Sequence, residues 1–386
     1  MSDFQELLTR GVEEVIDQQH LESALTSGKK LRVKLGIDPT SPHIHIGRAG
    51  ALWKLRDFQE LGHQVVFIVG DFTGLIADSS DKDSERPMMT EKQVEENIKT
   101  YFAQAAKIID PDKAEMHYNS EWLKKLGAVE IGKLADLFSM HEFEARENIS
   151  RRLKAGKRVS LRELLYPLFQ GFDSVAVKAD IELGGTDQKF NLLAGRTIQK
   201  AYGQEPQDII TRTLMEGTDG RKMSSSWGNV INITDEPGDM FGKAMSIGDE
   251  LIVKYFKLGT RVPLAEIEEF EKGLGDGANP KDVKVKLAFE LVNMYHGKEE
   301  ARKAKDEFEK VFSEGKNPEE IREVENKDDI TQTIVAAGVI TSNSEAKRLI
   351  DQKAVKVNYK VIDDWGYKLK KGDIVKIGPR KFLRIK

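Results

Sequence analysis

The sequence predicts an α/β domain built on a parallel sheet, followed by an α-helical domain and a small α+β domain. From residue 31 to 220, short segments rich in β-branched residues alternate with longer segments of helical periodicity, as in a parallel sheet covered by helices. From residue 249 to 324, apolar residues recur every three to four positions, which is typical of helices. The end of the chain has the pattern of one helix and then short strands around Gly366, Gly372 and Gly378. We therefore predict domains at residues 1–246, 247–326 and 327–386.

Composition excludes several classes of protein. The chain has 386 residues, of which 39% are hydrophobic, but no run of about 18 apolar residues that could cross a membrane. Its first segment, MSDFQELLTRGVEEVI, has the pattern of an acidic amphipathic helix and lacks the apolar core of a signal peptide, so we expect a cytoplasmic protein. There is no cysteine, and the seven histidines show no metal-binding spacing, so we expect no disulfide and no protein-bound metal.

The first strand and turn lie in VKLGIDPTSPHIHIGRAG, residues 33–50. In the predicted strand Val33–Ile37, Leu35 and Ile37 are apolar and β-favouring. Residues 38–40 break the strand, and Ser41-Pro42 supplies helix-start chemistry before Ile46. A helix that begins at the end of a strand offers free backbone N–H groups, which suit an anion. His43 and His45 would add imidazole donors there. The alternative is a solvated turn with two incidental histidines.

Four further segments are predicted strands, and in a parallel sheet ligands bind beyond the carboxyl ends of the strands. After the second strand comes a loop that alone would be an ordinary surface loop. Beside the histidine turn, however, Asp78 is a candidate for binding an amino group, and Lys82 and Arg86 are candidates for binding phosphate. The four strands are Gln64–Gly70, Glu115–Tyr118, Asp180–Gly184 and Asp208–Thr211.

A charged helical segment, residues 121–160, interrupts the alternation. Such an insertion is usually a dimer contact or a lid. Leu134, Leu137, Phe138 and Met140 give it apolar surface, and periodicity alone leaves open whether they face a partner or the domain's own core.

The next helix carries polar residues on one face, because Tyr166, Gln170 and Asp173 recur at i, i+4 and i+7. They could be merely solvated. However, the following strand ends in GGTDQ, whose glycines allow a ligand close to the backbone and whose Asp187 and Gln188 would point into the same crevice.

A Gly-Lys-Ser-rich loop, GRKMSSSWGN, occupies residues 220–229. Together with His45-Ile46-Gly47 it resembles the HIGH and KMSKS signatures of class I aminoacyl-tRNA synthetases. Arg48 replaces the usual second histidine, and Ser225 replaces the second lysine. YxxxQxxD followed by GGTDQKFN resembles the tyrosine pocket of bacterial tyrosyl-tRNA synthetases, in the subgroup with lysine before the GxDPT turn.

This resemblance implies a Rossmann-like catalytic domain with a helical insertion, anticodon-stem-binding helices, and a reaction that forms tyrosyl-adenylate from L-tyrosine and ATP before transfer to tyrosine tRNA. It implies ATP with Mg²⁺ as substrate, and we also expect a homodimer.

Asp78, Tyr166 and Gln170 would hold the amino group, Asp173 the phenol, with Lys34 near it, and Gln188 the carboxylate side. Asp187 would bind the ribose, Thr40 and His45 the phosphates, and Lys82, Arg86 and Lys222 the pyrophosphate. We assign Arg48 to the catalytic set, and Gly36, Asp38, Gly47, Met223, Ser224 and Ser225 to ATP binding.

Charge is unevenly distributed along the chain. The formal net charge is −4, yet residues 331–386 carry thirteen Lys and Arg against five Asp and Glu. This end resembles the small RNA-binding module of a ribosomal small-subunit protein, of pseudouridine synthases and of tyrosyl-tRNA synthetases. We expect Lys347, Arg348, Lys353 and Lys356 to contact RNA backbone, the alternative being a solvated face.

Two other functions remain possible from the residues. A tryptophan-specific relative would share the fold, and Asp173 and the RNA-binding tail argue against it. A non-catalytic RNA-binding paralogue would explain the departures at Arg48 and Ser225, and the presence of His45 and Lys222 argues against it.

Overall fold

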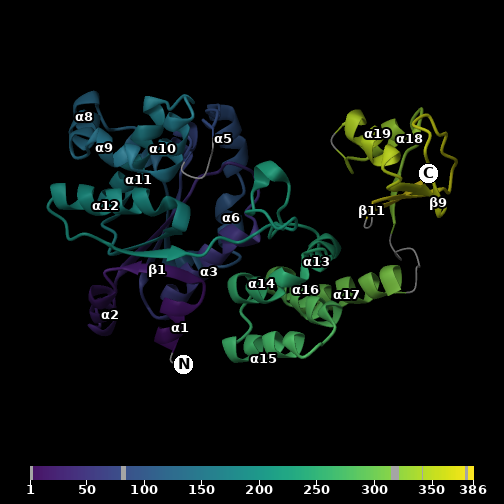
Figure 1. Cartoon of the computed structure of the whole chain (residues 1–386), viewed down its shortest axis with the longest axis horizontal. Coiled ribbons are helices and arrows are strands. Elements are labelled where there is room, and N and C mark those ends of the chain that lie inside the picture. Colours follow the sequence, from purple (N-terminus) through teal and green to yellow (C-terminus); the bar gives the residue numbers. More distant parts are fainter. Residues whose placement is uncertain (1–2, 80–83, 314–320, 341, 379–380) are drawn as a thin grey trace. The chain divides into compact units, whose positions relative to one another are not determined.

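The computed structural model describes residues 3–79, 84–313, 321–340, 342–378 and 381–386. It divides into two compact units, Met1–Asp235 with Ile247–Leu287, and Glu236–Ser246 with Ala288–Lys386. The first unit contains a six-stranded sheet and the second contains a five-stranded sheet (Figure 1). Our division into three domains remains a prediction.

The larger sheet has the strand order β1-β6-β5-β2-β3-β4, and all its neighbours are parallel except β1 and β6. All five predicted strands are confirmed to within one residue at each end. Chain order reverses between β2 and β5, so a ligand crevice is expected beyond the carboxyl ends of these two strands. The strands are β1 Val12–Ile16, β2 Arg32–Ile37, β3 Gln64–Val69, β4 Ala114–Tyr118, β5 Ile181–Gly185 and β6 Asp208–Arg212.

The prediction of one N-terminal helix is wrong in its second half. Helix α1, Asp3–Thr9, is short, and Gly11 has a φ of 63°, a left-handed conformation that a glycine adopts without strain. The following VEEVI segment then forms β1, which pairs antiparallel with β6 so that Val12 lies opposite Arg212. Pairing with a distant strand, rather than local periodicity, decides the structure here.

Helices connect and cover the strands of this sheet. Helix α3 packs on β2 and β3, and α11 packs on α12 and β2. The middle of β3 is fully buried, so the sheet forms the centre of the core. The helices up to β6 are α2 Gln18–Thr26, α3 Ile46–Glu60, α4 Asp71–Ile76, α5 Glu91–Ile98, α6 Tyr101–Ala105, α7 Ser120–Leu123, α8 Ala128–Asp136, α9 Met140–Glu144, α10 Glu147–Lys154, α11 Leu161–Val177 and α12 Lys189–Ala201.

The insertion is helical as predicted and comprises α7 to α10. Leu134 is buried in a cluster with residues of α11 and α12, and Leu137 and Phe138 pack against this cluster, so these three belong to the domain's own core. Met140 is exposed, as are Val129 (67%) and Leu161 (78%). The insertion therefore both packs on its own domain and presents apolar side chains outward.

The segment after the sheet is helical as predicted up to Ser313. It comprises α13 Pro237–Met245, α14 Ile252–Gly259, α15 Leu264–Gly275, α16 Pro280–His296 and α17 Lys298–Ser313, and residues 276–279 form the break between α15 and α16. The expected helical pattern fails at Arg322–Val324, which forms strand β7 and pairs in parallel with β11, Lys381–Ile385. These three residues therefore belong to the C-terminal sheet.

The C-terminal module forms around its own apolar core. Its helices are α18 Ile330–Ala336 and α19 Asn343–Asp351, and its sheet has the order β7-β11-β10-β8-β9, with β8 Val355–Val357, β9 Lys360–Val361 and β10 Ile374–Ile377. Ile334, Ile350 and Val375 are fully buried in this core. Within the described part of the whole chain, no helix is long and apolar enough to cross a membrane.

Candidate active site

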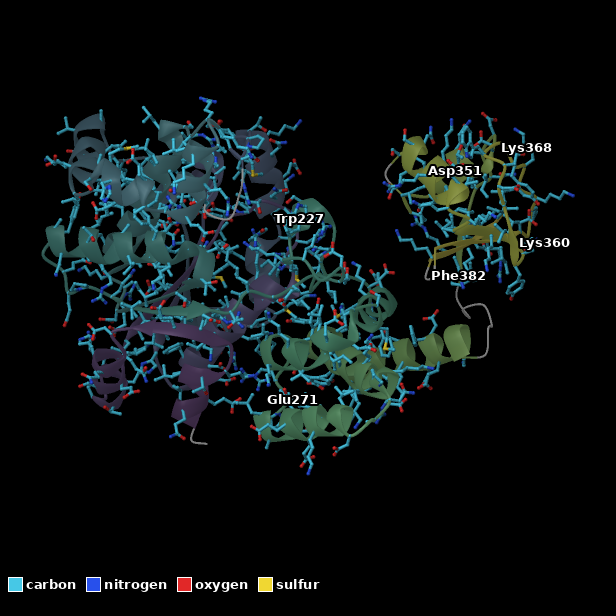
Figure 2. All side chains as sticks on the ribbon, in the orientation of Figure 1. Trp227, Glu271, Asp351, Lys360, Lys368 and Phe382 are labelled. Atoms are coloured by element: carbon cyan, nitrogen blue, oxygen red, sulfur yellow. The ribbon has the colours of Figure 1, made fainter. Side chains whose placement is uncertain are left out.

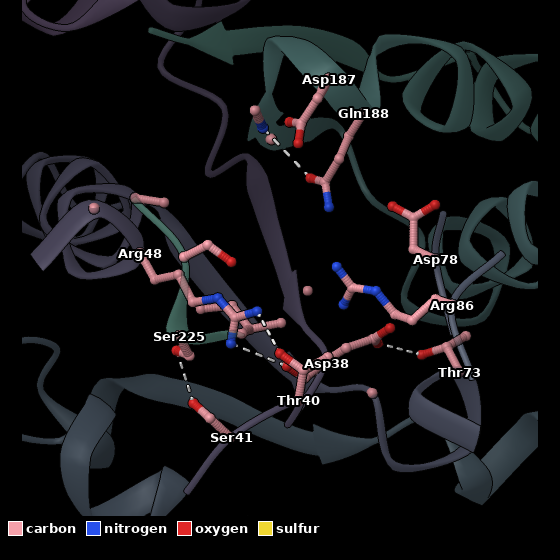
Figure 3. A pocket seen from close by; sticks show the side chains of 18 of the residues that line it. Asp38, Thr40, Ser41, Arg48, Thr73, Asp78, Arg86, Asp187, Gln188 and Ser225 are labelled. Atoms are coloured by element: carbon pink, nitrogen blue, oxygen red, sulfur yellow. Dashed lines mark hydrogen bonds between the residues drawn. The ribbon is translucent and has the colours of Figure 1, made fainter. Parts of the chain in front are cut away.

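A cavity of about 630 Å³ opens beyond the carboxyl ends of β2 and β5, where chain order reverses. Asp78 and Arg86 enter from one side, Arg48 from the opposite side, and Asp187 and Gln188 from a third (Figure 3). Seventeen of the predicted catalytic and substrate-binding residues line it together. They are Gly36, Asp38, Thr40, His45, Gly47, Arg48, Asp78, Arg86, Tyr166, Gln170, Asp173, Asp187, Gln188, Lys222, Met223, Ser224 and Ser225.

The histidine turn differs in detail from our prediction. Helix α3 is capped by His45 and not by Ser41-Pro42, and Nδ1 of His45 accepts the backbone N–H of Arg48 at 3.3 Å. Burial, followed by the nearby charges of Arg48 and Lys222, lowers the pKa of His45 to about 3. His45 is therefore neutral at physiological pH, and only its Nε2–H is left to donate to a ligand. His43 contacts Thr234 instead and does not line the cavity.

Arg48, the departure from the expected second histidine, holds the turn together. Its Nη2 donates to Oγ1 of Thr40 at 2.8 Å, and its Nη1 donates to the carbonyl of Asp38 and to the hydroxyl of Tyr101, each at 3.2 Å. The Tyr101 hydroxyl in turn donates to the carbonyl of Ser41 at 2.8 Å. A fixed guanidinium thus stands at the part of the cavity where phosphates were predicted.

Asp38 joins this turn to α11. Its carboxylate accepts the hydroxyls of Thr73 at 2.7 Å and of Tyr166 at 2.9 Å. Burial raises the pKa of Asp38 to about 6, although these two hydrogen bonds oppose the shift. Because the Tyr166 hydroxyl donates to Asp38, the Tyr166 oxygen is left to accept a hydrogen bond from an amino group.

Asp173 is a buried acceptor in the wall of the cavity, only 3% exposed. It accepts Nε1–H of Trp122 at 2.7 Å and Nδ2–H of Asn119 at 3.2 Å. Burial raises the pKa of Asp173 to about 7, against the opposing effects of the Lys34 charge and these hydrogen bonds. The two donors fix the orientation of the carboxylate.

Lys34 does not line the cavity, and its place near the substrate hydroxyl stays a prediction. Its side chain is fully buried; Nζ forms an ion pair with Glu182 at 2.9 Å and donates to Oγ of Ser174 at 2.8 Å. It acts on the cavity through its charge, which favours the ionised form of Asp173. Glu182 also accepts Nε2–H of Gln170 at 3.1 Å, so the same pair orients Gln170.

The loop that bears Asp78 is held by the insertion. Ala77 has a φ of 65°, and Ser79 donates its hydroxyl to Glu163 at the start of α11. Glu163 forms a bidentate pair with Arg152 of α10 at 2.5 and 2.9 Å, and both side chains are 1% exposed. Burial opposes ionisation of Glu163, but hydrogen bonds from Arg152 and Ser79 outweigh it and lower its pKa to about 2. Lys82, predicted to bind phosphate, lies outside the described residues.

The Gly-Lys-Ser-rich loop closes the cavity at the side of β5. Nζ of Lys222 lies 2.7 Å from Oδ2 of Asp187, and the hydroxyls of Ser41 and Ser225 are 3.2 Å apart. On the outside of the loop the guanidinium of Arg221 lies 4.7 Å from the ring centroid of Trp227, which is labelled in Figure 2. The loop thus brings its lysine to the residue predicted to bind ribose.

Sequence reasoning missed several residues of this site. Arg212 ends β6 and lines the cavity, so the rule that ligands bind at carboxyl ends of strands could have indicated it. Asn119 was not missed, because it directly follows the predicted strand Glu115–Tyr118, where that rule places ligand contacts, and it lines the cavity. Trp122 and Arg152 could not be found in this way, because their partners are distant in the sequence. Within the described residues, no group of three or more His, Cys, Asp or Glu side chains could hold a metal ion.

The four basic residues predicted to bind RNA are all exposed on the C-terminal module. Lys347 and Arg348 lie on α19, Lys353 follows this helix, and Lys356 lies in β8. Nζ of Lys347 lies 4.9 Å from the ring centroid of Trp365, so a cation and an exposed aromatic ring occur together. Such a surface suits a nucleic-acid backbone and its bases.

Two family models match the chain. Residues 26–313 match the model described as tRNA synthetases class I (W and Y), and residues 332–375 match the S4 domain. The chain belongs to this family of class I tRNA synthetases, and its C-terminal module is an S4 domain.

The chain is also similar to named proteins over nearly its whole length. The chain is 47% identical to a protein of Carboxydothermus hydrogenoformans named Tyrosine–tRNA ligase, with 98% of this chain and 97% of that protein covered. It is 44% identical to a Thermotoga maritima protein of the same name, with 98% and 96% covered. Among solved structures, tyrosyl-tRNA synthetase from Archaeoglobus fulgidus has a TM-score of 0.62 at 22% identity, covering 78% of this chain and 98% of that one. That likeness shows the fold.

Proposed function

We propose that this chain is a tyrosine–tRNA ligase, which joins L-tyrosine to ATP as tyrosyl-adenylate and then transfers tyrosine to the 3′ end of its tRNA. The observation that carries the proposal is Asp173, a buried carboxylate held by two donors in the wall of the cavity. Such an acceptor suits a phenolic hydroxyl. The relatives named above support the choice of tyrosine over tryptophan.

The amino-acid end of the cavity would bind tyrosine at three points. Asp173 accepts a hydrogen bond from the phenolic hydroxyl. Asp78 and the Tyr166 oxygen accept from the ammonium group, together with Gln170, and Gln188 lies on the carboxylate side. This orientation directs the tyrosine carboxylate toward the histidine turn, where the α-phosphate of ATP would lie.

The phosphate end would activate ATP through position and charge. A carboxylate oxygen of tyrosine attacks the α-phosphorus, the bond from that phosphorus to the bridging oxygen breaks, and pyrophosphate leaves with both bonding electrons. Thr40 and the Nε2–H of His45 donate to phosphate oxygens, while Arg48, Arg86 and Lys222 stabilise the negative charge that develops on the leaving group. Lys82 is proposed for the same role.

The remaining ATP contacts follow from the loops around the phosphates. Asp187 accepts from the ribose hydroxyls, Gly36 and Gly47 let ATP approach the backbone closely, and Asp38 orients the turn. Met223, Ser224 and Ser225 cover the nucleotide from the Gly-Lys-Ser-rich loop. Mg²⁺ would arrive bound to ATP, because this ion prefers substrate phosphates and water to a cage of protein ligands.

Three further properties are proposed. The exposed basic face with Lys347, Arg348, Lys353 and Lys356 contacts the tRNA backbone. The exposed apolar residues Val129, Met140 and Leu161 of the insertion and of α11 form a homodimer contact. The protein acts in the cytoplasm.

Exchange of labelled pyrophosphate into ATP tests the adenylate step without tRNA. Exchange that depends on tyrosine, and that tryptophan and phenylalanine support poorly, is the expected result. Exchange with tryptophan in place of tyrosine would establish the tryptophan-specific alternative, and no exchange with any amino acid would establish the non-catalytic one.

A further inference from the structure

The segment that carries Lys222 is a short hairpin. Glu216 and Lys222 form an antiparallel bridge, the N–H of Gly217 donates to the carbonyl of Arg221 at 2.7 Å, and the N–H of Met223 donates to that of Met215 at 2.9 Å. One strand of the hairpin therefore bears the lysine that we place at the departing pyrophosphate. The other strand bears Glu216, and its hydrogen bonds fix the position of the strand that bears Lys222.

Asn229 forms hydrogen bonds with the hairpin strand that bears Lys222. Its Nδ2 donates to the carbonyl of Lys222 at 3.1 Å, and its Oδ1 accepts the N–H of Ser224 at 2.9 Å. A Cβ at Gly217 would lie 2.3 Å from the Asn229 carbonyl oxygen, so the two segments are too close for any larger residue. The backbone of Lys222 is thus held from both sides.

Helix α14 contacts the other strand of this hairpin, the one that bears Glu216. The hydroxyl of Tyr255 donates to the Glu216 carbonyl at 2.8 Å, and Nζ of Lys254 lies 2.6 Å from the Glu216 carboxylate. Tyr255 is fully buried, and neither Tyr255 nor Lys254 lines the cavity. The two contacts act on the backbone and on the side chain of one residue, directly opposite Lys222.

The far end of α14 is itself anchored to the catalytic domain. Arg10 donates to the carbonyls of Phe256 and Thr260 at 3.3 and 2.7 Å, and Arg212 donates to that of Leu258 at 3.4 Å. Cationic side chains at the C-terminal end of a helix satisfy its last carbonyls and interact favourably with its dipole. The helix therefore has a fixed end from which it can hold the hairpin.

We propose that α14 acts as a brace for the hairpin, and that Tyr255 and Lys254 are positioning residues that act on catalysis through Glu216 and Lys222. The inference rests on the proposed function, because it concerns the leaving-group lysine of that reaction. It predicts that removing a contact between α14 and Glu216 slows adenylate formation without weakening the binding of tyrosine.

The test combines Tyr255→Phe and Lys222→Ala in one double-mutant cycle, with pyrophosphate exchange as readout. Loss of one hydrogen bond is worth about 0.5–1.5 kcal/mol, so we expect Tyr255→Phe to lower kcat about two- to twelvefold with an unchanged KM for tyrosine. In the Lys222→Ala background the same change should have no further effect. Tyr202→Phe, at a half-exposed tyrosine outside the cavity, is the matched control and should change neither parameter.

An equal fractional loss in both backgrounds would overturn the proposal, as would an unchanged kcat in Tyr255→Phe. If Tyr255→Phe does not fold, Lys254→Met replaces it, since Lys254 is partly exposed. An unmutated protein without tyrosine-dependent exchange would refute the proposed function instead, so the two failures are distinct.

Discussion

Nζ of Lys222 lies 2.7 Å from Oδ2 of Asp187, so the cation proposed for pyrophosphate and the carboxylate proposed for ribose satisfy each other. Binding of ATP must separate this pair and give each partner its own part of the nucleotide. The pair therefore keeps both side chains oriented in the cavity before the substrate arrives.

Lys222→Ala should slow adenylate formation far more than it weakens tyrosine binding, because the lysine contacts charge that is greatest in the transition state. Loss of one such donor costs about 10²-fold or more in kcat. Pyrophosphate exchange at saturating tyrosine gives the measurement. Lys189→Ala is the control, since Lys189 pairs with Glu14 and does not line the cavity. An unchanged kcat with a raised KM for tyrosine would refute the role.

Asp173→Asn should reduce the preference for tyrosine over phenylalanine. The lost hydrogen bond to a charged acceptor is worth about 1.5–3 kcal/mol, or about ten- to a hundredfold in the ratio of kcat/KM values. Asp180→Asn is the matched control, because Asp180 pairs with Lys29 and does not line the cavity. The assignment of the pocket fails if Asp173→Asn and Asp180→Asn discriminate equally well.

The pH dependence of kcat/KM for tyrosine should show an acid limb near pH 7. Asp173, with a pKa of about 7, accepts the hydrogen bond from the phenolic hydroxyl best when ionised, so activity is highest above this pH and falls as the carboxyl is protonated. In Asp173→Asn the limb should move toward pH 6, where Asp38 titrates. His45 stays neutral throughout this range and contributes no limb. A limb that stays at the same pH in the variant would contradict the assignment.

Arg152→Met should destabilise the protein strongly, since it leaves Glu163 buried without its cation. Breaking a buried ion pair from one side costs about 3–5 kcal/mol. The neighbouring Arg151→Met removes an exposed pair with Glu147 from the same helix and should cost about 1 kcal/mol or less. Urea unfolding of both variants measures the difference. Equal midpoints for the two variants would show that the buried pair does not hold the insertion to α11.

Truncation separates the S4 domain from the catalytic domain. A cut at residue 327, our predicted boundary, would leave β7 without its partner β11, so the chain should end at Ser313. We expect pyrophosphate exchange to survive and aminoacylation to fall, with a shallower dependence of tRNA binding on salt because fewer phosphate contacts release counterions. If the shortened chain binds tRNA with the same salt dependence as the full chain, the S4 domain does not contact the tRNA backbone.

Local signals predict most of this fold and site, and they fail where a distant partner decides. The strands from Val33–Ile37 onward are short segments that alternate with helical ones, and residues that follow their carboxyl ends line the cavity. The segment Val12–Ile16 has a helical pattern, and only pairing with β6 makes it a strand. Lys34 forms its buried ion pair with Glu182, far along the chain. No periodicity in a single sequence contains such a pairing.

The place of β1 at the edge of the sheet determines how late during synthesis the sheet can be completed. Strand β1 ends at Ile16 and its partner β6 begins at Asp208, so about 190 residues are synthesised between the two. Chains are made at about 5–20 residues per second, so β1 waits on the order of ten seconds or more before it can pair. During that interval its hydrogen-bonding groups must be satisfied by water or by a chaperone. The sheet cannot be completed along this edge until the strand that follows α12 has emerged.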